Sequence, residues 1–90
     1  MGLFTFVLEY GGGTYLSQVR AENFAAAPKA WADELNAEEI SDEGNIFKIE
    51  LLSSLESENP TPLDGLVNTW CLSLSVLDEL ALVHYCQTVG

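Results

Sequence analysis

The side chains that could do chemistry fall into two groups, an acidic stretch and a cysteine–histidine group near the C-terminus. The acidic stretch runs from residue 33 to residue 64 and holds ten carboxylates against one base, Lys48. A thiol or hydroxyl beside an imidazole is the minimum for nucleophilic catalysis, and two thiols with an imidazole are possible zinc ligands. The residues of the second group are Cys71, Ser73, His84 and Cys86.

The acidic stretch is densest at its beginning. Six carboxylates lie close together there: Asp33, Glu34, Glu38, Glu39, Asp42 and Glu43. The whole chain has a formal charge of −11, which repels nucleic acid and speeds the approach of a basic protein. We therefore predict that these six residues bind a basic protein partner, as in an immunity protein, an antitoxin or another inhibitor, and that the protein does not bind nucleic acid.

A second interpretation of the same acids is that they only keep a small protein dissolved, because runs of charge usually form a solvated surface. Calcium binding is not expected, since the segment Asp-Glu-Gly-Asn at residues 42–45 lacks the ligand spacing of an EF-hand loop. The functional and the solubilising interpretations both remain open at the level of sequence.

The cysteine–histidine group supports a weaker alternative, a small enzyme or ligand-binding domain. No Gly-x-Ser-x-Gly motif occurs, and no residue stands out as an orienting partner for His84. A structural zinc site needs four ligands, and the chain has no further Cys or His. We therefore predict no catalytic residues, no metal, no cofactor and no enzymatic activity, and we expect Cys71 and Cys86 to be reduced thiols.

Length and composition favour one small folded domain. Ninety residues leave room for a single hydrophobic core, so residues 1–90 are expected to form one domain. Hydrophobic residues make up 48% of the chain, enough to fold, yet no apolar run is long enough to cross a bilayer. Residues 1–10 lack the basic start of a signal peptide, so we expect a soluble, cytoplasmic protein.

The N-terminal part predicts a β-hairpin. In residues 3–10 the side chains of Phe4, Phe6, Leu8 and Tyr10 recur with a period of two on one side, three glycines follow, and residues 14–21 form the return strand. A two-residue turn at Gly11 and Gly12 would pair Leu8 with Tyr15, Phe6 with Ser17 and Phe4 with Val19. This register places most apolar side chains on one face.

One or two helices are expected between this hairpin and the C-terminal part. Phe24, Ala27, Trp31 and Leu35 recur at helical spacing, with Asn23 as a possible cap. Pro28 is awkward inside a helix, so the regular helix is expected to begin near Ala27. Residues 41–57 fit a helix or a strand, and their length favours a helix. Trp31 and Trp70 are expected to lie in the core.

Alternation of apolar residues predicts a second hairpin over residues 70–86. A turn at Asp78 and Glu79 would pair Leu72 with Tyr85. It would also place Cys71 opposite Cys86, and Ser73 opposite His84, on the face away from the helices.

The predicted fold class is therefore α+β: an antiparallel sheet of two β-hairpins in the order β-β-α-(α)-β-β, with one or two helices packed on one face. The order of the strands is left open. Exposed sheet edges also allow a homo-oligomer.

A resemblance to a known family begins in the first hairpin. Residues 4–35 read FTFVLEYGGGTYLSQVRAENFAAAPKAWADEL, an aromatic strand, a glycine turn, a return strand and an alanine-rich helix. This order resembles the opening of HicB-type antitoxin domains and covers about a third of the chain. The strand that follows the hairpin in that family is missing here, so no residue role is carried over.

Overall fold

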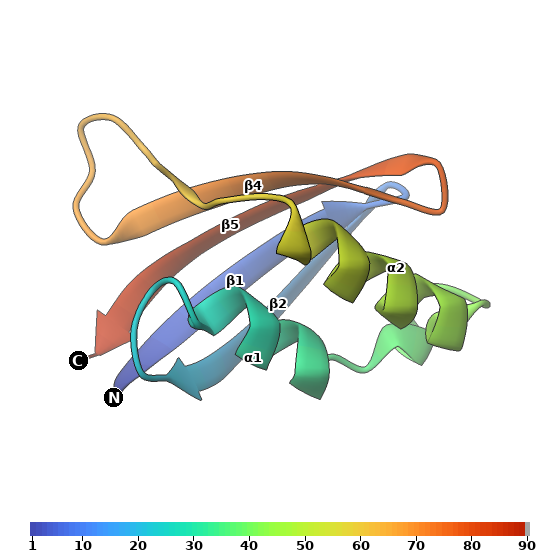
Figure 1. Cartoon of the computed structure of the whole chain (residues 1–90), viewed down its shortest axis with the longest axis horizontal. Helices are drawn as coiled ribbons and strands as arrows, with labels where there is room; N and C mark the ends of the chain where they lie inside the picture. Colours follow the sequence, from blue (N-terminus) through green and yellow to red (C-terminus); the bar gives the residue numbers. More distant parts are fainter. Residues whose placement is uncertain (90) are drawn as a thin grey trace.

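The protein folds as a five-stranded antiparallel sheet with its helices on one face, as a computed structural model of the chain shows for residues 1–89 (Figure 1). The strand order is β2-β1-β5-β4-β3. The predicted fold class is confirmed, with the two hairpins joined through β1 and β5. The strands are β1 (Gly2–Tyr10), β2 (Gly13–Ala21), β3 (Thr61–Pro62), β4 (Thr69–Val76) and β5 (Glu79–Val89).

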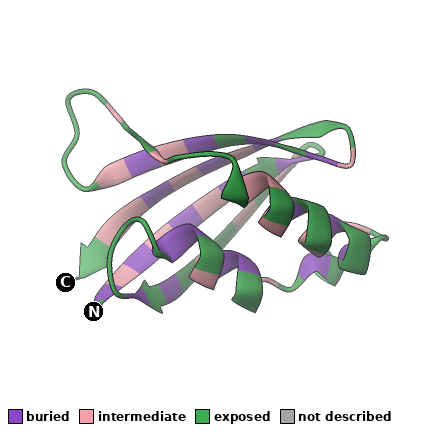
Figure 2. Cartoon of the chain, viewed as in Figure 1, coloured by how far each residue is buried: buried purple, intermediate pink, exposed green. Residues whose placement is uncertain are grey.

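Two α-helices and one short 3₁₀ helix connect the hairpins. They are α1 (Ala27–Glu34), η1 (Ala37–Glu39) and α2 (Gly44–Glu56). The inner sides of α1 and α2 are buried against the sheet, and their outer sides are exposed (Figure 2). None of the helices in residues 1–89 is both long and apolar enough to span a membrane.

The register of the first hairpin is as predicted. Phe4 lies opposite Val19, Phe6 opposite Ser17 and Leu8 opposite Tyr15. The backbone φ angles are +57° at Gly11 and +84° at Gly12, a left-handed conformation that glycine adopts without steric cost. The turn chemistry therefore fixes this register directly.

Helix α1 begins at Ala27 as the local sequence predicts, but its N-cap residue is Ala26 and not Asn23, which lies one turn earlier. The side-chain Oδ1 of Asn23 accepts a hydrogen bond of 2.9 Å from the backbone N–H of Ala26, and regular helix starts at Ala27 with Pro28 in its first turn. Residues 44–56 of the ambiguous segment are helical. Phe47 and Leu51 of α2 are fully buried, whereas Ile49 is exposed, a pattern with helical spacing that a half-buried strand would not give.

The predicted register of the second hairpin is wrong by two residues. Its turn lies at Leu77 and Asp78, both left-handed with φ of +52° and +63°. Leu72 is therefore opposite Val83, not Tyr85. A shift of two residues keeps every side chain on its original face, so the apolar pattern fits both registers equally well. The Oε1 atom of Glu50 in α2 accepts a hydrogen bond of 2.8 Å from the Leu77 backbone N–H and so holds the observed turn.

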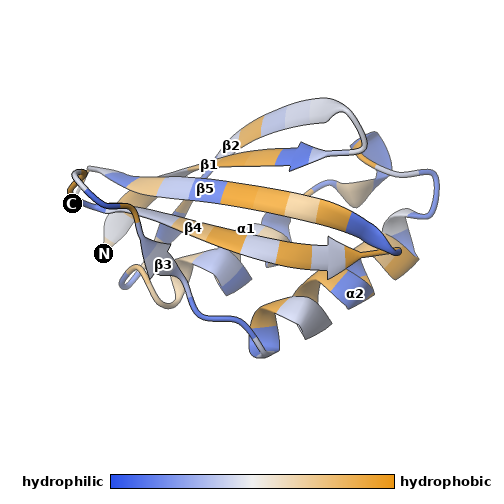
Figure 3. Cartoon of the chain, turned by 90° about the horizontal axis from the view of Figure 1, so that it is seen from above, coloured by the Kyte–Doolittle hydropathy of each residue, from blue (hydrophilic) through white to orange (hydrophobic). Residues whose placement is uncertain are grey.

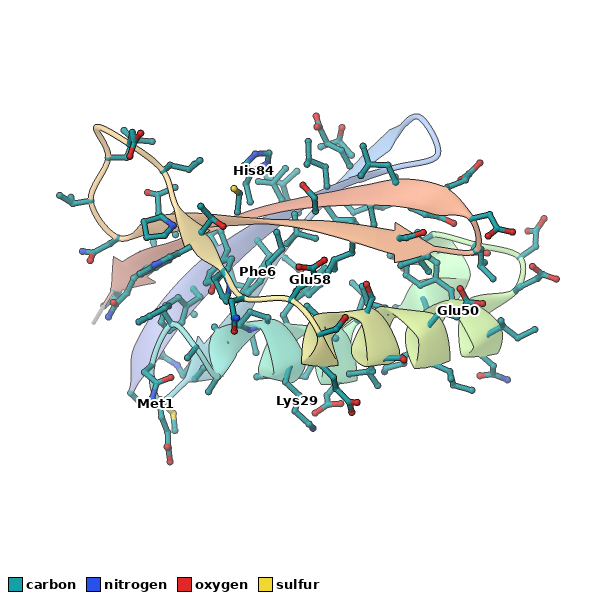
Figure 4. The ribbon with its side chains drawn as sticks, turned by 45° about the horizontal axis from the view of Figure 1, so that its top comes forward. Met1, Phe6, Lys29, Glu50, Glu58 and His84 are labelled. Atoms are coloured by element: carbon teal, nitrogen blue, oxygen red, sulfur yellow. The ribbon has the colours of Figure 1, made fainter. Side chains whose placement is uncertain are left out.

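Five aromatic rings form a continuous stack between the sheet and α1. Successive ring centroids are 4.9, 4.5, 5.3 and 4.8 Å apart. Phe6 lies between the sheet and the helices in Figure 4, and both tryptophans belong to the core as predicted. Because the rings come from α1, β1, β5, β4 and the loop before α1, the stack ties these elements together. In order, the rings are Trp31, Phe6, Tyr85, Trp70 and Phe24.

The stack contains the phenolic hydroxyl of Tyr85. It donates a hydrogen bond of 2.7 Å to the backbone carbonyl of Phe24, which anchors the loop between β2 and α1. Burial raises the pKa of Tyr85 above its ordinary value of 10.0. The pKa of Tyr10 is also raised, by burial first and then by the carboxylate of Glu79.

These shifts predict a loss of stability in alkali. Above about pH 10 the unfolded chain loses phenolic protons that the folded chain retains, so the free energy of unfolding falls as the pH rises. Tyr85→Phe should lower this free energy by about 1 kcal/mol at neutral pH, because the bond to Phe24 is lost. In the same variant the free energy of unfolding should fall less steeply above about pH 10, because only Tyr10 still contributes to the fall. Urea unfolding at a series of pH values measures both effects, and a decline as steep as in the wild type would contradict the assignment.

Candidate functional site

The six predicted partner-binding acids come together at one end of the helix layer. We call Asp33, Glu34, Glu38, Glu39, Asp42 and Glu43 the acidic corner. They lie at the end of α1, in η1 and in the turn before α2, the connection that is green in Figure 1. All six are exposed. A short connection between two packed helices therefore concentrates six carboxylates on one part of the surface.

The basic residues near the acidic corner do not neutralise it. Lys48 turns its Nζ atom toward the end of α1, where it donates hydrogen bonds of 2.6 Å to the Asp33 carbonyl and 3.3 Å to the Leu35 carbonyl. Lys29 forms an ion pair of 2.9 Å with the Asp33 carboxylate, the sole ion pair in residues 1–89. This pair is exposed, so it adds little stability. The remaining five acids of the corner have no basic partner within the described chain.

The backbone of the acidic corner is held in place by close packing. A Cβ atom added at Gly44 would lie 3.0 Å from Glu38 Cγ and 3.1 Å from the Glu38 backbone nitrogen. Glycine therefore lets η1 pack directly on the start of α2. The Ser41 hydroxyl accepts a hydrogen bond of 3.1 Å from the Glu43 backbone N–H. The carboxylates thus project from a fixed turn.

A groove next to the acidic corner runs along the free edge of the sheet. It has a volume of about 490 Å³ and lies between β2 and the segment from α1 to η1. Glu34 and Glu39 line it together with Ser17 and Trp31, whose Nε1 donates a hydrogen bond of 3.1 Å to the Ser17 hydroxyl. Because β2 is an edge strand, alternate backbone N–H and C=O groups point away from β1. This groove has no signal in the sequence, since its walls come from distant segments.

The cysteine–histidine group is only partly assembled. Cys71 lies opposite His84, not opposite Cys86 as predicted, and Ser73 lies opposite Leu82, not opposite His84. Cys86 faces Thr69. The corrected register of β4 and β5 causes these differences. The predicted face is right, because His84 points away from the helices in Figure 4.

Neither metal chemistry nor a disulfide follows from this arrangement. Within the described residues 1–89, no group of three or more His, Cys, Asp or Glu side chains could hold a metal ion. Both cysteines are free thiols. They are diagonal neighbours on adjacent strands, about 7–8 Å apart by sheet geometry, which is too far for a disulfide without movement of the backbone.

The corrected register predicts which cysteines can be cross-linked. In the double variant Thr69→Cys, Cys71→Ser, the introduced thiol is directly opposite Cys86, so mild oxidation should form a disulfide. The wild-type protein should keep both thiols under the same conditions. Thiol titration and mass spectrometry measure the outcome. If the wild type lost both thiols and the double variant kept them, Cys71 would lie opposite Cys86, and the register predicted from the sequence would be right.

Lys48 is predicted to act as a cap at the C-terminal end of α1. Lys48→Met keeps much of the aliphatic chain but removes the ammonium group from the α1 carbonyls, which should lower the free energy of unfolding by about 1 kcal/mol. Lys29→Met makes the same charge change but removes only an exposed ion pair, so it should cost less than about 0.5 kcal/mol. Chemical denaturation compares the two variants, and equal losses would contradict the capping role.

Comparison with models of protein families, with curated proteins and with solved structures found no match to this chain. The resemblance of residues 4–35 to the opening of HicB-type antitoxin domains accordingly stays an expectation drawn from the order of elements. The chemistry open to the protein follows from the acidic corner, the groove beside it and the cysteine–histidine group.

Proposed function

We propose that this protein is a non-enzymatic binding module that engages a basic protein surface through the acidic corner, in the manner of an immunity protein, an antitoxin or another inhibitor. One observation carries the proposal. Six exposed carboxylates project from a fixed turn, while the two nearest bases are occupied by a helix end and by Asp33. A charge cluster that is left without partners inside the chain is available to a partner outside it.

The charge of the acidic corner would affect both the rate at which a partner binds and the choice of partner. A concentrated negative potential accelerates the approach of a basic partner and disfavours acidic ones. The packing of η1 on Gly44 also means that little backbone freedom is lost when a partner binds. These are properties that an inhibitor of a basic protein requires.

The groove along β2 extends the proposed contact. An extended basic segment could pair with the free backbone groups of β2 and so add a strand to the sheet. Its lysine or arginine side chains would then reach Glu34 and Glu39, which line the same groove. Backbone pairing would supply affinity, and the carboxylates would select for positive charge.

A small enzyme or ligand-binding domain is the second candidate, and it rests on the proximity of Cys71 and His84. These residues are directly opposite each other in β4 and β5. Across β1 the residue opposite His84 is Val7, so neither strand neighbour is a carboxylate that could orient the imidazole. The hydroxyl of Ser73 faces Leu82. The acidic corner therefore has the stronger support.

A cytoplasmic location is part of the proposal. Two free thiols on the surface of the sheet fit a reducing compartment, where cysteines are not driven into disulfides. Edge-to-edge pairing of two copies through β2 would use the same backbone groups as a partner strand, so the two kinds of association would compete.

Charge reversal at two places separates a specific site from a general effect of charge. Glu38→Lys with Glu39→Lys changes the acidic corner, and Glu56→Lys with Glu58→Lys makes the same change in net charge near the other end of α2. The probe is a fluorescent peptide rich in lysine and arginine, followed by anisotropy over a salt series. We expect binding that weakens with salt, a loss of about tenfold or more for the first variant, and a much smaller loss for the second.

Two outcomes would contradict the proposal. Equal losses in both charge variants would mean that the peptide responds to net charge alone, and no loss in either would mean that the acids serve solubility. A circular dichroism spectrum and a melting curve for each variant confirm that the fold is retained, since all four positions are exposed.

A further inference from the structure

The sheet face that the helices leave uncovered, which we call the open face, differs sharply from the rest of the surface in charge. Strands β2, β1, β5 and β4 lie side by side across it (Figure 3). With His84 counted as neutral, Glu9 and Arg20 are the two formal charges on it, so its net charge is zero in a chain of −11. On the open face, two copies of this acidic protein would therefore not repel each other strongly.

The open face also carries apolar side chains where a solvent-exposed sheet usually carries polar ones. Leu16 is 68% exposed and Leu80 is 64% exposed. Leu16 lies beside Val7, and Leu82 lies between Glu9 and Ser73 on the neighbouring strands. The apolar members are Leu3, Val7, Leu16, Cys71, Leu80, Leu82 and Cys86.

We propose that the open face is the interface of a homodimer, in which two sheets pack face to face and both helix layers point outward. Two antiparallel sheets commonly pack in this way, about 10 Å apart and with their strands within about 30° of each other. The proposal does not rest on the proposed function, because the acidic corner lies on the helix side of the sheet; the two surfaces meet at Leu16 of β2, which also lines the groove. The two acidic corners of a dimer would then lie on its two outer surfaces, which the helix layers form.

Charge complementarity specifies the arrangement of the two copies. Arg20 lies across from Leu3 at one end of β1, whereas Glu9 lies near the other end. A two-fold axis in the plane of the sheets and perpendicular to the strands reverses the strand direction while keeping β1 above β1 and β2 above β2. This operation brings each Glu9 near Arg20 of the partner subunit. The dimer would therefore contain two Glu9–Arg20 pairs, each joining one subunit to the other.

The size of the open face meets the requirement for a stable dimer. Four strands at a spacing of about 4.8 Å, each about 30 Å long, cover roughly 580 Å² per subunit, or roughly 1,200 Å² for the pair. Specific protein interfaces begin at about this total area. A basic partner has no reason to select this face, since five of the six acids of the acidic corner stand elsewhere without a partner while the open face is neutral by count.

Sedimentation velocity over a concentration series tests the proposal on the full chain. Leu16→Lys and Ile49→Lys form a matched pair, because both residues are 68% exposed and both changes add one positive charge. Leu16 belongs to the open face and Ile49 to the outer side of α2. We expect a monomer–dimer equilibrium whose dissociation constant rises about tenfold or more in Leu16→Lys and changes little in Ile49→Lys. A wild type that stays monomeric, or equal effects of the two changes, would overturn the proposal.

A charge exchange tests the two-fold arrangement in a way that does not depend on apolar contacts. Glu9→Arg and Arg20→Glu should each weaken the dimer, because each places like charges opposite each other across the interface. The double variant carries the exchanged pair and should regain the wild-type dissociation constant. A double variant as weak as either single change would overturn the proposed arrangement. Melting curves of all three variants identify any change that acts through folding.

Discussion

The stacking of Phe6 between Trp31 and Tyr85 is the contact on which the rest of the structure depends. Its ring centroids lie 4.9 Å from Trp31 and 4.5 Å from Tyr85, so one side chain of β1 holds a helix and a strand of the other hairpin. Tyr85 in turn anchors the loop before α1 through the Phe24 carbonyl. Large aromatic side chains dominate the energy of small cores. The position of α1, and with it the acidic corner at its end, follows from this stack.

Burial of one sheet face divides the protein into two unlike surfaces. The helix layer carries eight of the ten acids of residues 33–64, because its outer sides and connections are exposed there; Glu58 and Asp64 lie beyond the end of α2. The opposite face contains strand residues that are neutral in total and partly apolar. One surface is suited to a basic partner through its charge, and the other is suited to a second copy through its lack of charge. The two proposals thus use opposite sides of the same sheet and meet at its β2 edge, where Leu16 also lines the groove.

Sequence patterns predicted the first hairpin fully and the second only by face. Gly11 and Gly12 specify a turn by their own conformational freedom, whereas the turn at Leu77 is held by the hydrogen bond that its backbone N–H donates to Glu50, which is distant in sequence. Alternation with a period of two cannot distinguish registers that differ by two residues. The acids of the corner were recognisable from composition alone. The groove along β2 was not, since the packing of α1 and η1 against the edge strand creates it.

A map of backbone amide NMR shifts during titration with a lysine- and arginine-rich peptide tests the role of the acidic corner most directly. Shifts should concentrate in residues 33–43 and along β2, where the carboxylates and the free strand edge lie together. The amides around Cys71 and His84 should remain unchanged. Shifts scattered over every acidic residue, including Glu56, Glu58 and Asp64, would instead show that the peptide responds to net charge and that the corner is no specific site.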